Sequence, residues 1–366
     1  MNSAGCALEE SRLIISTDAG GDPDDAFTLA LAAVTEPRLK LVLTTDEFRD
    51  LRRAKFARYL LNLLGRDDVL VAAGRGRAGS KYWAAAGLTP ADTPIWWVDP
   101  YIAVANVCGF DSSASAEPVR WLGIGPMTDL AYLLTRDANN AYSMGLAHRL
   151  HITQMGGAIN YRNPYRAEHN FRLDAAAVHQ VVPRAENLTL VLSDHTFNGA
   201  TEIDEGSPIY QLLAASDKPW AQLLIAHMQQ WFSGFHPATM MHDPLALSVV
   251  LGLGFVSLLD RQFHLAADAR MSLGPGYTAK LSVGADYPRF MSWIHATLRT
   301  GKPKRLPDFE RSFETLRAVY NPMSPGSLIT LDWALPGPLS DEQPDAVPRQ
   351  DARVSGRDPE PPAGSC

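Results

Sequence analysis

Short runs of apolar residues alternate along the chain with longer segments in which apolar residues recur at helical spacing. Six runs are expected to be strands: residues 12–17, 39–45, 69–72, 119–124, 150–154 and 188–192. Four segments between them are expected to be helices: residues 25–35, 51–65, 129–134 and 174–181. Strands and helices in alternation predict an α/β fold, with a mostly parallel central sheet flanked by helices on both faces.

The patterned part of the chain is followed by a segment of different composition. Residues 11–335 are expected to form a single large domain, preceded by a flexible N-terminus at residues 1–10. Residues 336–366 contain seven Pro and six acidic residues but no aromatic residue. Such a segment buries too little apolar surface to offset the entropy of ordering it. We therefore expect a disordered, Pro-rich acidic tail rather than a segment that follows a fixed path over the surface.

Four carboxylates follow the first expected strand within eight residues: Asp18, Asp22, Asp24 and Asp25. Ligands of parallel sheets bind beyond the carboxyl ends of the strands, which is where this acidic loop lies. A loop with dense oxygen ligands and neither Cys nor His suits a hard cation, Ca²⁺ or Mg²⁺. The alternative is structural, with Asp24 or Asp25 capping the next helix and the other acids in solvent.

Composition narrows the possible functions. Lys and Arg number 33 against 40 for Asp and Glu, so the formal net charge is −7 and nucleic-acid binding is not expected. Three Cys cannot form a disulfide framework or a zinc cluster, and their scarcity suits a reducing compartment. No signal peptide is visible, and the longest apolar stretch, residues 246–259, is too short to span a bilayer. The expected location is cytoplasmic, without membrane contact.

Four further stretches follow the acidic loop in an informative order. The five stretches are Thr-Asp-Ala-Gly-Gly-Asp-Pro-Asp-Asp-Ala at 17–26, Gly-Pro-Met-Thr-Asp-Leu-Ala at 125–131, Met-Gly-Gly at 155–157, Glu-His-Asn at 168–170 and Met-His-Asp-Pro-Leu-Ala at 241–246. Together they resemble the motifs of the inosine–uridine-type nucleoside hydrolases, which are calcium-dependent N-ribohydrolases, over about residues 12–300. The resemblance implies a nucleoside-hydrolase-like fold with a Rossmann-like core. It also implies hydrolysis of a ribonucleoside to free base and ribose.

The resemblance assigns roles to individual residues. The expected ligands of Ca²⁺ are three carboxylates and one backbone carbonyl: Asp18, Asp25, Asp243 and the carbonyl of Thr128. The expected ribose contacts are polar side chains, with one Met under the sugar: Asp24, Asn163, Glu168, Asn170 and Met155. Asp18 would also be the general base for the attacking water. His242 would contact the base and protonate it as it leaves, and His195 is a second candidate histidine.

The chain departs from the family pattern on the base side and after the second expected strand. The family's Ala-Gly-Asn is replaced by Thr-Asp-Glu at 45–47, so Glu47 or Asp46 is a candidate for the missing Asn's contact with substrate. His169 stands where the family often has Phe. The aromatic pairs at 82–83 and 96–97 either stack on a base or belong to the core. The preferred base therefore stays open.

The expected function is Ca²⁺-dependent hydrolysis of a purine or pyrimidine ribonucleoside. One alternative is the same chemistry on a modified nucleoside or another small glycoside in specialised metabolism. A second alternative is a non-catalytic, metal-dependent sugar-binding protein, although a retained base and acid disfavour pure binding. The resemblance also implies a homo-oligomer, a dimer or a tetramer.

Overall fold

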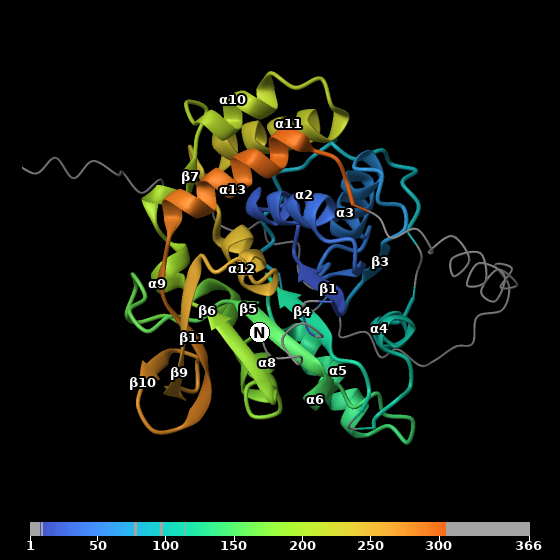
Figure 1. Cartoon of the computed structure of the whole chain (residues 1–366), viewed down its shortest axis with the longest axis vertical. Coiled ribbons are helices and arrows are strands. Elements are labelled where there is room, and N and C mark those ends of the chain that lie inside the picture. Colours follow the sequence, from blue (N-terminus) through green and yellow to red (C-terminus); the bar gives the residue numbers. More distant parts are fainter. Residues whose placement is uncertain (1–7, 9, 77–78, 96–97, 114, 305–366) are drawn as a thin grey trace, which may run out of the picture. The chain divides into compact units, whose positions relative to one another are not determined.

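A nine-stranded sheet organises the chain (Figure 1). The computed structural model describes residues 8, 10–76, 79–95, 98–113 and 115–304. The strand order is β10-β9-β11-β6-β5-β4-β1-β2-β3. The strands of this sheet are β1 Arg12–Thr17, β2 Leu39–Thr44, β3 Leu70–Ala73, β4 Val119–Gly123, β5 Leu150–Met155, β6 Asn187–Val191, β9 Val256–Leu265, β10 Met271–Leu273 and β11 Tyr277–Ala285. Seven of them, β1 to β6 and β11, pair in parallel, whereas β9 pairs antiparallel with both β10 and β11.

Helices cover both faces of the sheet (Figure 1). One face packs against α2 Asp24–Thr35, α3 Arg52–Leu63, α10 Pro208–Ala214, α11 Pro219–Gly234, α12 His242–Val250 and α13 Tyr287–Thr300. The other packs against α4 Pro100–Cys108, α5 Thr128–Ala138, α6 Leu146–Arg149 and α8 Ala175–Val181. Short elements complete the described chain: α7 His169–Leu173, α9 Ser193–Thr196, the 3₁₀ turn η1 Gly199–Thr201, and the two-stranded sheet of β7 Glu202–Ile203 and β8 Thr239–Met240.

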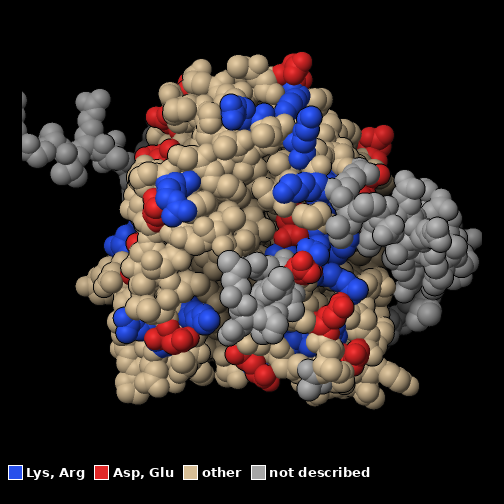
Figure 2. Space-filling view, in the orientation of Figure 1, with Lys and Arg blue, Asp and Glu red and all other residues tan. Residues whose placement is uncertain are grey.

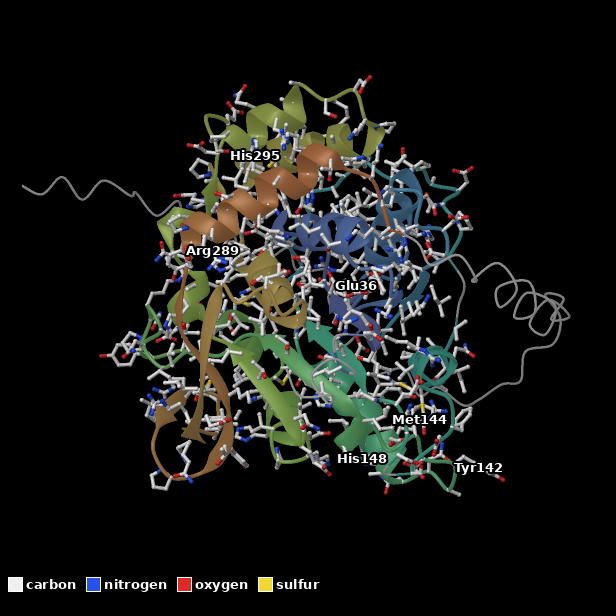
Figure 3. All side chains as sticks on the ribbon, in the orientation of Figure 1. Glu36, Tyr142, Met144, His148, Arg289 and His295 are labelled. Atoms are coloured by element: carbon white, nitrogen blue, oxygen red, sulfur yellow. The ribbon has the colours of Figure 1, made fainter. Side chains whose placement is uncertain are left out.

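Alternate residues of β1 supply the two cores. Leu13 and Ile15 belong to one buried cluster, whereas Ile14 belongs to the cluster on the opposite face. A strand buried on both faces reads as a continuous apolar run, which is the pattern of residues 12–17. At the far end of α2, Glu36 forms an ion pair with Arg120 of β4 at 2.9 Å and ties helix to strand (Figure 3). Acidic and basic side chains are interspersed over the face shown in Figure 2.

The structure confirms the α/β fold and all six expected strands, with ends that move by at most one residue. The expected helix at 129–134 is longer and spans Thr128–Ala138. The antiparallel strands β9, β10 and β11 were not predicted. Most residues of β9 are exposed or half-buried, so its sequence lacks the apolar run that marks the central strands. The expected tail at 336–366 lies outside the described residues.

The order of the strands fixes where a ligand site should lie. β1 lies between β4 and β2, so the chain leaves β1 at the point where the winding of the sheet reverses. Ser16 pairs with Gly123 and Thr17 with Thr44, which brings the loops after β1, β2 and β4 to the same edge. In the described part of the chain, no helix combines the length and the apolar character that crossing a bilayer requires.

Candidate metal and active site

Three buried carboxylates meet at this edge of the sheet. Asp24 and Asp25 lie in the first turn of α2, and Asp243 lies in the first turn of α12. One oxygen from each carboxylate lies within 4.8 Å of the others. The three residues are at most 5% exposed. Segments from opposite ends of the fold thus build one compact group of oxygen atoms, the carboxylate triad of Asp24, Asp25 and Asp243.

Backbone N–H groups at two helix starts surround the carboxylate triad. Asp25 N donates to Asp24 Oδ1 at 3.1 Å, and Asp243 N donates to Asp24 Oδ2 at 3.4 Å. Thr17 Oγ1 donates to Asp25 Oδ1. The positive ends of the two helix dipoles stabilise negative charge here. Pro23 precedes α2 and makes no side-chain cap, so the acids of the first turn are not explained by capping.

The carboxylate triad has the chemistry of a site for a hard cation. Burial raises the pKa values of Asp24, Asp25 and Asp243, and repulsion from the neighbouring carboxylates raises them further. Such groups stay ionised together only when a positive charge balances them. Three closely spaced carboxylate oxygens fit Ca²⁺ or Mg²⁺ better than a softer metal. The residues present therefore fit the expected divalent cation.

Asp18 lies in the same acidic loop as Asp24 and Asp25 but outside the carboxylate triad, and Thr128 follows β4. Asp18 is buried, and burial raises the pKa of its carboxyl, while the nearby Arg53 guanidinium opposes that rise. A Cβ added to Gly125 would lie 2.9 Å from Asp18 Oδ1, so only glycine fits there beside the carboxylate. Thr128 begins α5, and its hydroxyl donates to Asp174 Oδ2 at 2.7 Å. The charge of Asp18 also raises the pKa of Asp25, so the two carboxylates interact electrostatically.

Asp22, the extra acid of the loop, has a different partner. The Thr239 hydroxyl of β8 donates to Asp22 Oδ1. Burial raises the pKa of Asp22 to about 7, although the hydrogen bond from Thr239 lowers it. Asp22 does not belong to the carboxylate triad defined by the 4.8 Å separation.

Three residues expected at the ribose form one connected group. Glu168 caps α7, and its Oε2 accepts from Gly157 N at 2.9 Å and from Phe171 N at 3.2 Å. Asn170 Nδ2 donates to the Met155 carbonyl at 3.1 Å and lies 3.4 Å from the Met155 sulfur. All three of Met155, Glu168 and Asn170 are buried. Asn163, by contrast, is exposed, and its Oδ1 accepts from Tyr165 N at 3.0 Å, so the structure does not bring it to this group.

The two candidate histidines occupy different places. Burial lowers the pKa of His242 to about 4, with further lowering by Arg162 and His169. Its Nδ1 lies 2.9 Å from Thr196 Oγ1, and its ring stacks on Phe197 with centroids 6.0 Å apart. His195 lies 3.0 Å from Ser282 Oγ and lines a cavity of about 750 Å³ beside β9, β10 and β11. The lining of that cavity includes no member of the carboxylate triad.

Comparisons with known proteins agree with this geometry. The family model of the inosine-uridine preferring nucleoside hydrolases matches residues 13–299. The chain belongs to this family. No curated protein matches it in a sequence comparison.

Solved structures of nucleoside hydrolases share the fold. A plant nucleoside hydrolase, PpNRh1, has a TM-score of 0.62 at 19% identity over 79% of this chain and 99% of its own. A purine-preferring ribonucleoside hydrolase from Gardnerella vaginalis has a TM-score of 0.63 at 19% identity over 80% and 99%. The type III effector protein XopQ, solved with adenosine diphosphate ribose, has a TM-score of 0.59 at 17% identity over 82% and 100%. At these identities the likeness establishes the nucleoside hydrolase fold alone.

Aromatic rings cluster around Tyr82 in this nucleoside hydrolase. Tyr82 stacks on His169 with centroids 6.0 Å apart, and it meets Trp231 and Phe235 edge-on at 6.3 and 5.6 Å. Phe235 is 46% exposed. Trp83 turns the other way, packing edge-on against Phe48 and Phe56. Trp83 therefore fits the alternative of a core residue, base stacking by Tyr82 stays a prediction, and the pair at 96–97 lies outside the described residues.

Glu47 and Asp46, the candidates for the missing Asn, already have protein partners. Both carboxylate oxygens of Glu47 accept from Arg53, at 2.6 and 2.7 Å. Asp46 Oδ2 accepts from Ala54 N at 3.0 Å, and burial raises the Asp46 pKa to about 6. Sequence reasoning missed Arg53. Glu47 lies outside α3, so helical spacing gave no indication of the pair.

Gly20 connects the acidic loop to Trp83, and we expect Gly20→Ala to destabilise that loop. Gly20 has φ +100°, and a Cβ there would lie 2.4 Å from the Trp83 ring. The backbone strain of an alanine at this φ adds to the overlap of its Cβ with the Trp83 ring. The free energy of unfolding should therefore fall by about 2–4 kcal/mol. Chemical denaturation measures this change. Gly87→Ala is the control, since it also has positive φ but nothing within 4 Å of the added Cβ. Equal losses in the two variants would show that contact with Trp83 is unimportant.

Proposed function

We propose that this nucleoside hydrolase cleaves the N-glycosidic bond of a ribonucleoside in a Ca²⁺-dependent reaction, releasing a free base and ribose. The observation that carries the proposal is the carboxylate triad, buried at the edge of the sheet within 4.8 Å. A group of carboxylates so deeply buried is costly unless it binds a cation. Its place at the switch point of the sheet supports a catalytic site rather than a structural metal.

Asp18 is the proposed general base. Ca²⁺ bound by Asp25, Asp243 and the Thr128 carbonyl would supply an oriented water molecule of lowered pKa and hold two ribose hydroxyls. Asp18 follows β1 directly, so its carboxylate is held by the sheet edge rather than by a long loop. In this arrangement Asp18 takes the proton of the attacking water as the bond to the base breaks.

The ribose is proposed to bind between the carboxylate triad and the Met155 group. Asp24 belongs to the triad itself, so in this proposal it serves the sugar hydroxyls, the metal or both. Glu168 and Asn170 are held by backbone hydrogen bonds, which fixes their orientation before substrate arrives. Asn163 is proposed to join them only when the exposed segment around it moves inward.

His242 is proposed to donate a hydrogen bond to the leaving base. With a pKa of about 4 its ring is neutral at neutral pH, so it carries one N–H rather than a positive charge. When Nδ1 accepts from the Thr196 hydroxyl, that N–H is on Nε2. A neutral donor stabilises the negative charge that develops on the base without requiring an imidazolium ion.

We expect His242→Ala to slow hydrolysis of ordinary nucleosides by about 10²–10³-fold, because the base then leaves without a donor. Steady-state rates on inosine and uridine measure this effect. The control is 4-nitrophenyl riboside, whose leaving group departs as a stable anion and should react at nearly the wild-type rate. An equal loss on all three substrates would contradict a role at the leaving group.

Release of reducing sugar from a panel of nucleosides tests the proposed function. We expect turnover of at least one purine or pyrimidine ribonucleoside, abolished by a chelator and restored by Ca²⁺. Adenosine diphosphate ribose belongs in the panel, because a structural relative was solved with it, and release of adenine is its readout because it already contains a reducing ribose. If the protein binds Ca²⁺ but cleaves no member of the panel, the proposal of nucleoside hydrolysis is overturned.

A second candidate is the same chemistry on a modified nucleoside or another small glycoside. His169 favours it, because an imidazole stacked on Tyr82 gives the base side a polar edge. Turnover of a glycoside outside the standard panel would identify this case. Ribose binding in the presence of metal, without any hydrolysis, would instead identify a sugar-binding protein.

A further inference from the structure

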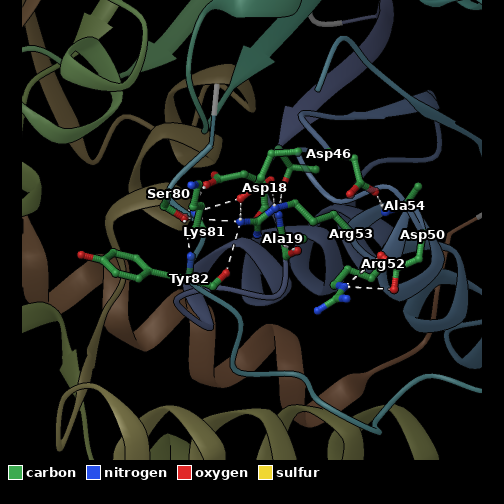
Figure 4. Close-up of polar contacts among 12 residues, drawn as sticks. Asp18, Ala19, Asp46, Asp50, Arg52, Arg53, Ala54, Ser80, Lys81 and Tyr82 are labelled. Atoms are coloured by element: carbon green, nitrogen blue, oxygen red, sulfur yellow. Dashed lines mark hydrogen bonds and ion pairs between the residues drawn. The ribbon is translucent and has the colours of Figure 1, made fainter. Parts of the chain in front are cut away.

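A buried arginine lies directly behind the acidic loop. Arg53, in the first turn of α3, is 0% exposed. Its Nε and Nη2 donate to the two carboxylate oxygens of Glu47 at 2.7 and 2.6 Å, a bidentate pair. Its Nη1 donates to the Asp18 carbonyl and, at 3.3 Å, to the Ala19 carbonyl (Figure 4). One guanidinium thus holds the backbone on which the Asp18 carboxylate is mounted.

The same guanidinium reaches a third loop. Nη2 donates to the Tyr82 carbonyl at 3.2 Å and lies 3.4 Å from Ser80 Oγ. Ser80 Oγ in turn lies 3.5 Å from Asp18 Oδ2. Arg53 therefore joins the segments that follow β1, β2 and β3, which enter the site from three adjacent strands (Figure 4).

These contacts leave Arg53 nothing with which to bind a substrate. A guanidinium has five N–H groups, and six acceptor atoms of the protein surround this one. The side chain is also closed to solvent, so it cannot meet a ligand in this conformation. Any effect of Arg53 on the reaction must act through the residues that it holds.

Glu47 is needed for Arg53 to be buried at all. A guanidinium without a counter-ion is strongly disfavoured in the interior, and the Glu47 side chain is only 9% exposed. Lys81 N donates to Glu47 Oε1 at 2.9 Å, which fixes the carboxylate from its other side. In this chain Glu47 stands near the position where the family pattern has the Asn of Ala-Gly-Asn.

We infer that Arg53, held by Glu47, is a positioning residue that fixes the loop of Asp18 and thereby the Asp18 carboxylate beside the metal-binding carboxylates. The inference concerns the loop itself, and its catalytic consequence rests on the proposed function. Glu47 acts through Arg53 and does not contact the substrate. A lysine at position 53 keeps the charge, but its three N–H groups are all on one nitrogen. It therefore cannot reach acceptors on three loops at once.

Three variants and one matched control test the inference. The variants are Arg53→Lys, Glu47→Gln and the double variant Arg53→Lys/Glu47→Gln. The control is Arg58→Lys, since Arg58 is also buried on α3 but donates to the carbonyls of Arg66 and Val69, near β3. Full-length proteins are compared by amide hydrogen exchange over residues 18–22, by Ca²⁺ titration, and by kcat and KM on a cleaved nucleoside.

We expect Arg53→Lys and Glu47→Gln each to speed exchange over residues 18–22 by about tenfold or more, while Arg58→Lys leaves it unchanged. Ca²⁺ affinity should fall. A displacement of the base by about 1 Å lowers kcat by about a hundredfold with little change in KM. The two losses of kcat should not add in the double variant, because both single variants break the same set of contacts.

Two results would overturn the inference. One is unchanged exchange over residues 18–22 in both single variants, or a change that Arg58→Lys reproduces. The other is a further rise in KM when Glu47→Gln is added to Arg53→Lys, which would show that Glu47 contacts the substrate itself. The exchange measurement needs neither metal nor substrate, so it decides the positioning role even when no nucleoside is hydrolysed.

Discussion

Asp18→Asn is expected to lower kcat for nucleoside hydrolysis by about 10²–10⁴-fold, the range that a general base contributes. Asparagine keeps the size of the side chain and its place beside Gly125 but cannot accept a proton from water. It also removes one negative charge from beside Asp25, so Ca²⁺ affinity should fall as well. Saturating Ca²⁺ during the kinetic measurement separates the loss of the base from the loss of metal.

Asp22→Asn is the comparison for this variant. It removes a carboxylate from the same loop, but one whose Oδ1 accepts from Thr239, whereas Asp18 lies beside Gly125 and Arg53. Its effect on kcat at saturating Ca²⁺ should be at least tenfold smaller. Similar losses in the two variants would mean that total negative charge matters and that Asp18 is not a specific base.

Removal of the metal is expected to make the stability of the protein depend strongly on pH. Burial raises the pKa of Asp22 to about 7 and raises those of Asp24, Asp25 and Asp243, whereas an unfolded Asp has a pKa of 3.8. Between pH 4 and pH 7 these four carboxyl groups therefore bind more protons in the folded, metal-free chain than in the unfolded chain. Their contribution to the free energy of unfolding falls as pH rises through this window, against the opposite contribution of buried histidines such as His242.

Thermal unfolding in a chelator and in excess Ca²⁺ measures this coupling. With the chelator, Tm should fall by about 5 °C or more between pH 5 and pH 8. The stabilisation by Ca²⁺ should be larger at pH 8, because ionised carboxylates bind the cation better. The Ca²⁺-bound protein at the same pH is the control, because ionisable groups outside the carboxylate site titrate in both forms. A stabilisation by Ca²⁺ that is the same at every pH would contradict a buried carboxylate site.

The central fold was predictable because its strands are buried on both faces. Residues 12–17 and 119–124 form apolar runs whose alternate side chains enter the two cores, so local sequence carries the signal. The strands β9, β10 and β11 lie at one end of the sheet, with Leu259, Leu273 and Val283 exposed. Such strands are defined by pairing with distant neighbours, and a local pattern does not reveal that pairing.

The site was predictable where chemistry requires a residue type at a fixed spacing. The acidic loop was found because four carboxylates in one loop need a common explanation, and the Met-His-Asp segment was found through its resemblance to the nucleoside hydrolases. The partners that position them could not be found in this way. Arg53 joins the loops of Asp18 and Ser80, which are 62 positions apart in the chain. The lowered pKa of His242 depends on burial and on Arg162, which only the folded chain brings near.

The carboxylate triad joins Asp24 to Asp243, which are 219 positions apart in the chain. A growing or refolding chain therefore has no complete site until α12 has packed beside α2. Because the cation binds only after this late event, Ca²⁺ should leave the rate of folding unchanged and slow the rate of unfolding. Under the proposed function, calcium thus lengthens the lifetime of the native state and does not change the speed of reaching it.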